Sequence, residues 1–192
     1  MKRMTFLIAA AMIMFSAMTA SAQKKVNVNH NGKSKALIAY FSATGTTERV
    51  AKLIAVTTGG ELYKIQPEKD YSAADLDWTV KTSRCCREND NPKSRPAILK
   101  GNVNMANYDI VYLGFPNWWN MAPRIINSFI ESYNLKGKTV IPFSTSGGSG
   151  IENSVKILKE TYPSINFQDG KLLNEATQSE VDKWISNKEL SL

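Results

Sequence analysis

ALIAYFSATGTT, residues 36–47, is the stretch of sequence that decides the fold. Its first six residues are apolar throughout, which predicts a strand that is buried on both faces of a parallel sheet. Its last six residues carry four hydroxyl side chains and one glycine, and a helix with an apolar face at Val50, Leu53 and Ile54 follows. A strand that turns directly into a helix is typical of an α/β domain.

The rest of the chain continues this alternation of strands and helices. We predict further strands at 62–65, 110–114 and 139–143, and a last pair of strand fragments at 165–167 and 171–173. Helices are expected after Pro123, after residue 150 and at the C-terminus. The polar stretch 67–106 gives a weaker pattern, with a helix expected near 73–81. The sequence therefore predicts one α/β domain, a doubly wound five-stranded parallel sheet.

The N-terminus has the pattern of a secretory signal peptide. Two basic residues precede an apolar run at 6–15, and small residues end at Ala22. The run is short for a membrane-spanning helix, and no cysteine stands at the cleavage point to carry a lipid. We predict a signal peptide at 1–22, a flexible lead-in at 23–35 and the domain at 36–192. The protein is expected to be exported to the periplasm, with no stable membrane anchor after signal removal.

Composition argues against several classes of function. The formal net charge is +7, but the basic residues are dispersed, and no basic run with interleaved aromatics indicates nucleic-acid binding. The single histidine, His30, lies in the lead-in, which argues against a metal site and against a hydrolase with a catalytic histidine. The only cysteines are the adjacent pair Cys85 and Cys86, which could bridge only through a strained ring. Two small side chains or a redox pair both remain open interpretations.

The hydroxyl-rich loop 42–47 is a candidate anion site. Amide groups at the start of a helix have no partner within the helix and carry partial positive charge, and Ser42, Thr44, Thr46 and Thr47 can add donors. The loop lacks the Gly-Lys end of a triphosphate loop and the spaced glycines of a dinucleotide fingerprint. A phosphate monoester fits better. The alternative is a threonine that merely caps the helix.

Two more loops follow predicted strands and have unusual compositions. GFPNWWN, residues 114–120, offers two adjacent tryptophans for stacking on a planar heterocycle. Asn117 in this loop tolerates a positive φ, so its peptide is expected to be able to reorient. STSGGSG, residues 144–150, allows close approach of backbone amides to a ligand. Ligands of open α/β sheets bind at such carboxyl ends of strands, so we expect the three loops to form one site.

These motifs together resemble a known family. Residues 41–47 resemble the phosphate loop of flavodoxins, and Pro116, Trp118 and Trp119 resemble the Pro-x-Trp-Trp loop of bacterial flavodoxin-like proteins. The stretches 75–78, 94–96 and 145–150 resemble further motifs of these proteins, and the likeness covers roughly 35–173.

The resemblance implies strand order 2-1-3-4-5 and bound FMN. It implies that the phosphate is held by Ser42, Thr44, Gly45, Thr46 and Thr47, and Ala43 of the same loop is also expected to bind the cofactor. The isoalloxazine ring would be flanked by Pro116, Asn117, Trp118, Trp119, Thr145, Ser146, Gly147, Gly148 and Ser149. Familiar flavodoxin electron shuttles are acidic, whereas this chain is basic and is expected to be exported.

The leading hypothesis for function is electron transfer through the flavin, with no side chain acting as catalytic acid or base. The partner would be a redox protein or a small-molecule electron acceptor. One alternative is an NAD(P)H-dependent FMN quinone reductase. A second is a module that binds FMN or another phosphate-bearing ligand without redox chemistry.

Overall fold

The computed structural model describes residues 35–189. The predicted signal peptide and nearly all of the predicted lead-in therefore lie outside the described residues. Within residues 35–189, no helix combines the length and the apolarity that a crossing of the bilayer requires.

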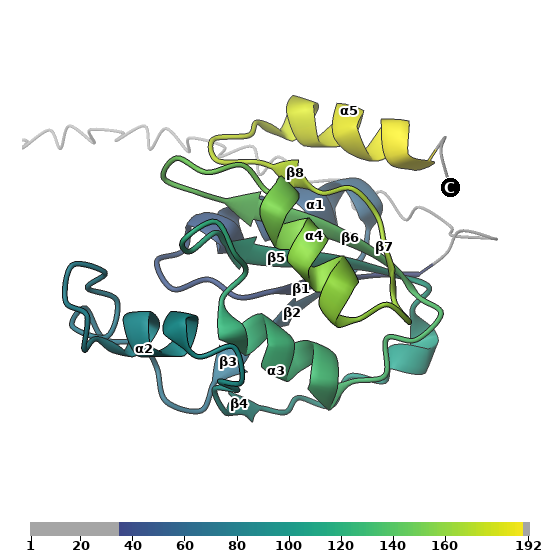
Figure 1. Ribbon diagram of the computed structural model, residues 1–192. Coiled ribbons are helices and arrows are strands. Elements are labelled where there is room, and N and C mark those ends of the chain that lie inside the picture. The colour runs from purple at the N-terminus through teal and green to yellow at the C-terminus, as the bar shows by residue number, and fades with distance from the viewer. Residues whose placement is uncertain (1–34, 190–192) are drawn as a thin grey trace, which may run out of the picture. The chain divides into compact units, whose positions relative to one another are not determined.

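One parallel sheet forms the centre of the domain (Figure 1). Its strands are β1 (Ala36–Tyr40), β2 (Glu61–Lys64), β5 (Ile110–Pro116), β6 (Thr139–Thr145), β7 (Asn166–Phe167) and β8 (Lys171–Leu172). The order is β2-β1-β5-β6-β7, and β8 also pairs with β6. Counted along the chain, this order is 2-1-3-4-5, with the last strand split into two fragments. The predicted fold class is confirmed.

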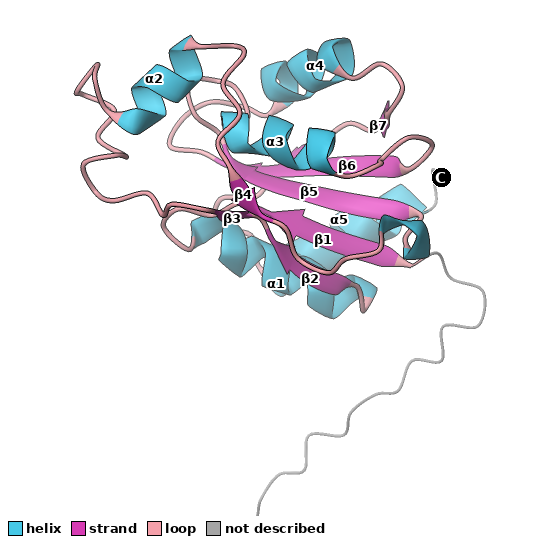
Figure 2. Ribbon diagram, turned by 90° about the horizontal axis from the view of Figure 1, so that it is seen from below, coloured by secondary structure: helices cyan, strands magenta, loops and turns pink. Residues whose placement is uncertain are grey.

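Helices cover both faces of the sheet (Figure 2). On one face lie α1 (Thr46–Thr58) and α5 (Gln178–Glu189), and on the other lie α3 (Arg124–Ser132) and α4 (Glu152–Thr161). Successive strand residues alternate between two cores, so that Leu37 packs toward α3 and α4 while Ile38 packs toward α1 and α5. Val181, Trp184 and Ile185 of α5 are buried, as the sequence predicts.

The segment after β2 differs from the prediction. It contains a small antiparallel pair, β3 (Gln66–Pro67) with β4 (Ile98–Leu99), the helix α2 (Arg84–Asp90) and the 3-10 turn η1 (Met105–Asn107). The prediction of a helix near 73–81 is wrong, because residues 73–82 form turns. Asp77 accepts hydrogen bonds from the amide and the hydroxyl of Thr79, and such local bonds compete with a helix. The helix begins instead after Ser83, whose hydroxyl caps it.

The sheet brings three loops together. β1 pairs with β5 and β5 pairs with β6, so the loops that follow these strands leave adjacent carboxyl ends. Both β5 and β6 run further than predicted, and Pro116 pairs with Thr145 at their last position. The stretch 42–45 therefore lies beside the segments that begin at Asn117 and Ser146.

Candidate functional site

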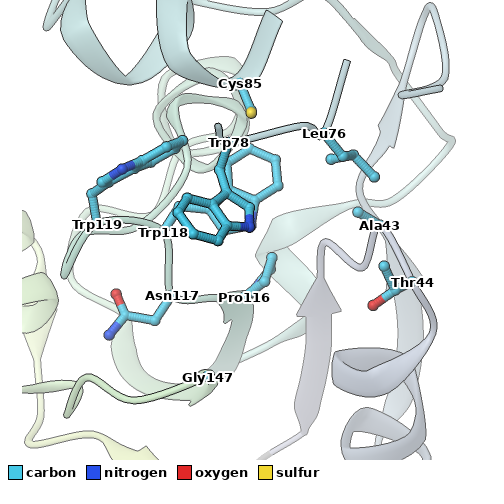
Figure 3. A pocket seen from close by; sticks show the side chains of 10 residues that line it. All are labelled: Ala43, Thr44, Leu76, Trp78, Cys85, Pro116, Asn117, Trp118, Trp119 and Gly147. Atoms are coloured by element: carbon cyan, nitrogen blue, oxygen red, sulfur yellow. The ribbon is translucent and has the colours of Figure 1, made fainter. Parts of the chain in front are cut away.

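Two adjoining cavities lie at this edge of the sheet. Their volumes are about 370 Å³ and about 410 Å³. Both are lined by Thr44, Pro116, Asn117, Trp118 and Gly147, so they form one continuous site. Figure 3 shows that Trp118 and Trp119 come from the loop after β5, whereas Ala43 and Thr44 come from the loop after β1.

The two cavities differ in chemistry where they do not overlap. The residues that line only the larger cavity are polar: Thr46, Thr145, Ser146, Asn174 and Glu175. The residues that line only the smaller cavity are mainly apolar: Ala43, Leu76, Trp78, Cys85 and Trp119. We call these the polar cavity and the apolar cavity. The site thus suits an elongated ligand with a polar end and a flat apolar end.

The first loop leads into α1, and no side chain caps the N-terminus of this helix. Gly45 is the N-cap of α1, with a φ of 91°, and it has no side chain with which to cap the helix. Ser42 Oγ accepts a hydrogen bond from the Gly45 amide at 3.1 Å, which closes the turn. The first-turn amides of α1 have no partner within the helix, so they can face an anion. The alternative that a threonine merely caps this helix is wrong.

Thr47 and Thr145 form a buried bridge between the first and third loops. Their hydroxyl oxygens are 2.8 Å apart, and the residues are 1% and 5% exposed. The Asn117 amide also donates to the Thr145 carbonyl at 2.7 Å. All three loops are therefore connected at Thr145, which also lines the polar cavity.

The tryptophan loop is a tight two-residue hairpin. Trp118 and Met121 exchange two backbone hydrogen bonds of 2.9 Å, and the residues between them have φ values of 46° and 62°. Positive φ at both central residues is the pattern of a type I′ turn. It falls on Trp119 and Asn120 and not on Asn117, whose expected ability to reorient its peptide stays a prediction. The Asn117 side chain instead braces the third loop, donating to the Gly150 carbonyl and accepting from the Ser154 hydroxyl.

The two tryptophans of this loop have different environments. Trp118 is half-buried and makes edge-on contacts with Phe41 and Tyr71, at centroid distances of 5.8 Å and 5.7 Å. Tyr71 is itself covered by the Arg84 guanidinium, 3.9 Å from its ring centroid, and its hydroxyl donates to Glu88 at 2.6 Å. Burial and the Glu88 carboxylate raise the pKa of Tyr71, so it stays protonated. The contacts with Phe41 and Tyr71 therefore fix the orientation of the Trp118 ring, whereas the Trp119 side chain is 43% exposed.

Hydrogen bonds fix the third loop from within and from the C-terminal segment. Ser146 Oγ accepts from the Gly148 and Ser149 amides at 3.2 Å and 2.9 Å. The Ser146 amide donates to Asn174 Oδ1 at 2.7 Å. Arg49 of α1 donates to the Asn174 and Ala176 carbonyls at 2.7 Å and 3.0 Å, which anchors the segment before α5.

The structure brings together most of the residues predicted for the site. Ten of them line the two cavities: Ala43, Thr44, Thr46, Pro116, Asn117, Trp118, Trp119, Thr145, Ser146 and Gly147. Ser42 lines a neighbouring cavity of about 310 Å³. The remaining four, Gly45, Thr47, Gly148 and Ser149, do not line the two cavities and support the loops.

Sequence reasoning missed five lining residues. Asn174 and Glu175 follow the last short strand, and no local pattern distinguishes them. Leu76 and Trp78 belong to a stretch of family resemblance to which no role was attached. Cys85 is buried against the apolar cavity, and burial raises the pKa of its thiol. Both cysteines are free.

Comparisons with known proteins agree with this fold. A family model described as Flavodoxin matches residues 35–188. The chain is similar to two proteins assigned as flavoproteins, from Bacteroides eggerthii DSM 20697 and Bacteroides uniformis ATCC 8492, at 52% and 56% identity. Each has a TM-score of 0.78, with 81% and 80% of this chain and 98% of each structure covered.

A more distant match was solved with a ligand. It is a flavoprotein from Lactobacillus acidophilus NCFM in complex with FMN, at 25% identity and a TM-score of 0.65. The alignment covers 80% of this chain and 99% of that one. No curated protein matches the chain.

Proposed function

Because the chain belongs to the flavodoxin family, we propose that it binds FMN in the two adjoining cavities and transfers electrons through the flavin. The family match spans nearly the whole of the described residues, and the Lactobacillus relative was solved in complex with FMN. The observation that carries the proposal is the division of the site into a polar end and an apolar end. FMN has the same division between its phosphate and its ring.

The polar cavity has a donor set that fits a phosphate monoester. Thr44 and Thr46 contribute hydroxyls, and the first turn of α1 contributes amides with no helical partner. No lysine or arginine lines this cavity, and its one charged residue is Glu175. Binding of the phosphate would therefore rest on neutral donors and the helix dipole rather than on ion pairs.

The apolar cavity has surfaces that fit a flat ring. Trp118 is fixed by Phe41 and Tyr71, so a ring that stacks on it would find a surface whose orientation is already set. FMN supplies the redox chemistry when it is bound, and the protein supplies orientation and the electrostatic environment. None of the ten residues that line the apolar cavity is charged, so they would exclude water without acting as acid or base.

We extend the proposal to export. The residues before the domain have the pattern of a signal peptide, and the domain itself begins at β1. On this proposal the mature protein exchanges electrons in the periplasm with a redox protein or a small acceptor. Expression in a bacterium with an intact secretion system should yield a periplasmic chain whose intact mass corresponds to cleavage after Ala22. A full-length cytoplasmic product would contradict export.

FMN titration of the purified protein tests the cofactor assignment. We expect visible flavin absorption after gel filtration, together with strong quenching of tryptophan fluorescence, because Trp118 would stack on the ring. Riboflavin, which lacks the phosphate, is the matched ligand control and should bind more weakly. Equal affinity for both ligands would contradict the role of the polar cavity, and no binding at micromolar FMN would overturn the proposal. Reversible reduction of the bound flavin then tests electron transfer.

A further inference from the structure

Another cavity, of about 500 Å³, lies between the last strand and the last helix. Residues of β8, of the segment that follows it and of α5 line this cavity, at the yellow end of the chain (Figure 1). We call it the C-terminal cavity. Leu172, Leu173, Ala176 and Trp184 give it an apolar lining, and Trp184 packs edge-on against Tyr112. Its volume and this apolar lining are typical of a site for a small molecule.

The same cavity has two lysines without an ion pair. Lys171 and Lys183 are exposed, and neither side chain forms an ion pair or a hydrogen bond within the described part of the chain. Hydrogen bonds from the Thr177 amide and hydroxyl, and then the charges of Lys183 and Lys171, lower the pKa of the Glu180 carboxyl. Both ammonium groups therefore act on the same part of the cavity.

The two carboxylates of this cavity are compensated to different degrees. Glu180 lies in the first turn of α5 and accepts both hydrogen bonds from Thr177, so the N-terminus of the helix offsets its charge. Glu175 is exposed and has neither a hydrogen bond nor an ion pair among residues 35–189. The cavity therefore combines two available cations, one uncompensated carboxylate and an apolar lining.

We propose that Lys171, Lys183 and Trp184 form a second ligand site, separate from the flavin site, for a small aromatic monocarboxylate. The ammonium groups suit its carboxylate, and the apolar lining around Trp184 suits its ring. A compact multivalent anion such as phosphate would gain nothing from the apolar lining and would be repelled by Glu175. An uncharged ring would gain nothing from the lysines.

The C-terminal cavity adjoins the polar cavity, because Asn174 and Glu175 line both. The backbone between the two cavities is anchored, since Arg49 donates to the Asn174 carbonyl and the Ser146 amide donates to the Asn174 side chain. A carboxylate bound at the lysines would offset their attraction for Glu175 and add a negative charge near the proposed phosphate position. Its binding should therefore weaken FMN binding. This linkage rests on the proposed function, whereas the second site does not.

Calorimetric titration of the FMN-free protein with 2-naphthoate tests the site. The matched ligand is 2-naphthamide, which has the same ring system without the charge. We expect 2-naphthoate to bind about fivefold more tightly at low ionic strength, because pairs with two exposed lysines are individually weak. The difference should disappear in about 1 M salt, where such pairs are screened. Equal affinity of the two ligands at low ionic strength, or no binding of 2-naphthoate, would overturn the proposal.

Variants that remove one charge locate the site. Lys171→Met and Lys183→Met should each weaken binding of 2-naphthoate by about two- to threefold, and the double variant should bind it no more tightly than 2-naphthamide. Lys156→Met, on an exposed residue of α4 that does not line this cavity, removes the same charge and should leave the affinity unchanged. An equal loss in Lys156→Met would make the effect one of net charge. Unchanged affinity in the double variant would overturn the site.

Titration of the FMN-saturated protein tests the linkage. At low ionic strength 2-naphthoate should bind about two- to threefold more weakly than it binds the FMN-free protein, and saturating 2-naphthoate should weaken FMN by the same factor. Riboflavin, which lacks the phosphate, should show no such effect, and an equal effect would overturn the electrostatic linkage. Complete loss of 2-naphthoate binding with either flavin would place it in the flavin site and overturn the proposal. Absence of FMN binding would overturn the proposed function alone, because the second site is measured without FMN.

Discussion

Replacing the two threonines that join the first and third loops tests how the site is assembled. Thr47 Oγ1 and Thr145 Oγ1 lie 2.8 Å apart in a buried position, 98 residues apart in sequence. Valine has nearly the shape of threonine and similar helix propensity, and it is favoured in strands. Thr47→Val in α1 and Thr145→Val in β6 therefore remove a hydroxyl with little change in packing.

The magnitudes follow from the burial of the pair. Each single variant leaves the other hydroxyl buried without its partner, which costs about 1–3 kcal/mol of unfolding free energy. The double variant leaves no unsatisfied hydroxyl and buries two methyl groups instead, so it should lie within about 1 kcal/mol of the wild type. The two changes should therefore be strongly non-additive: the coupling is the sum of the two single losses minus the loss in the double variant, which gives about 1–6 kcal/mol.

Urea unfolding of the four proteins measures this coupling. The midpoint should fall in each single variant and recover in the double variant, with the slope unchanged. Thr161→Val, at the exposed end of α4, is the matched control and should change stability by less than about 0.5 kcal/mol. FMN affinity of the double variant should stay within about threefold of wild type, because the two hydroxyls face each other.

Two results would refute this reasoning. If the losses of the single variants simply add in the double variant, the hydroxyls are not each other's essential partners. If the double variant folds normally but loses FMN affinity by more than tenfold, the hydroxyls serve the ligand directly, as the family resemblance implies. The second result would restore Thr47 and Thr145 as phosphate-binding residues.

Four further predictions concern the ligand and the thiol. Thr44→Val combined with Thr46→Val should weaken FMN binding, since a hydrogen bond to a charged group contributes about 1.5–3 kcal/mol; riboflavin affinity, measured in parallel, should barely change. Trp118→Ala should reduce FMN affinity by about tenfold and shift the flavin potentials in spectroelectrochemical titration, because stacking adds about 0.5–1.5 kcal/mol beyond area burial. Glu175→Gln should tighten FMN binding by a few-fold at low salt and have no effect at high salt, because it removes a screened repulsion of about 0.5–1 kcal/mol. Burial raises the pKa of the Cys85 thiol, so the reactive thiolate forms only at alkaline pH. Alkylation of Cys85, followed by mass spectrometry, should therefore be slow at neutral pH and faster in strong alkali. Rapid labelling at pH 7 would contradict the burial of this thiol.

The sequence predicts the fold well because its signals are local. The apolar strand at 36–41, the hydroxyl loop after it and the apolar faces of the helices each depend on neighbouring residues. The alternation of these elements then leaves few sheet topologies. The failure of the helix prediction at 73–81 is also local in origin, because the carboxylate of Asp77 bonds to the nearby backbone of Thr79 and favours a turn.

The site was only partly predictable because it depends on distant contacts. Nothing in the loop compositions distinguishes Thr44, which faces the cavities, from Thr47, which faces Thr145. Asn174 joins the site through distant contacts: Arg49, on a helix far earlier in the chain, donates to its carbonyl, and the Ser146 amide donates to its side chain. The positive φ of Trp119 is equally invisible in sequence, since the sign of φ depends on the hairpin that Trp118 and Met121 close.

The anchoring of Asn174 by Arg49 has a consequence for the order in which the protein is made. α1 is among the first elements to leave the ribosome, and the segment that it anchors is among the last. The polar cavity lacks part of its wall until the segment before α5 has emerged and docked. A ribosome-bound chain stalled before Asn174 would carry the strand, loop and helix that begin the domain, yet it would have no complete place for a ligand. Cofactor loading therefore belongs to the finished chain and not to its synthesis.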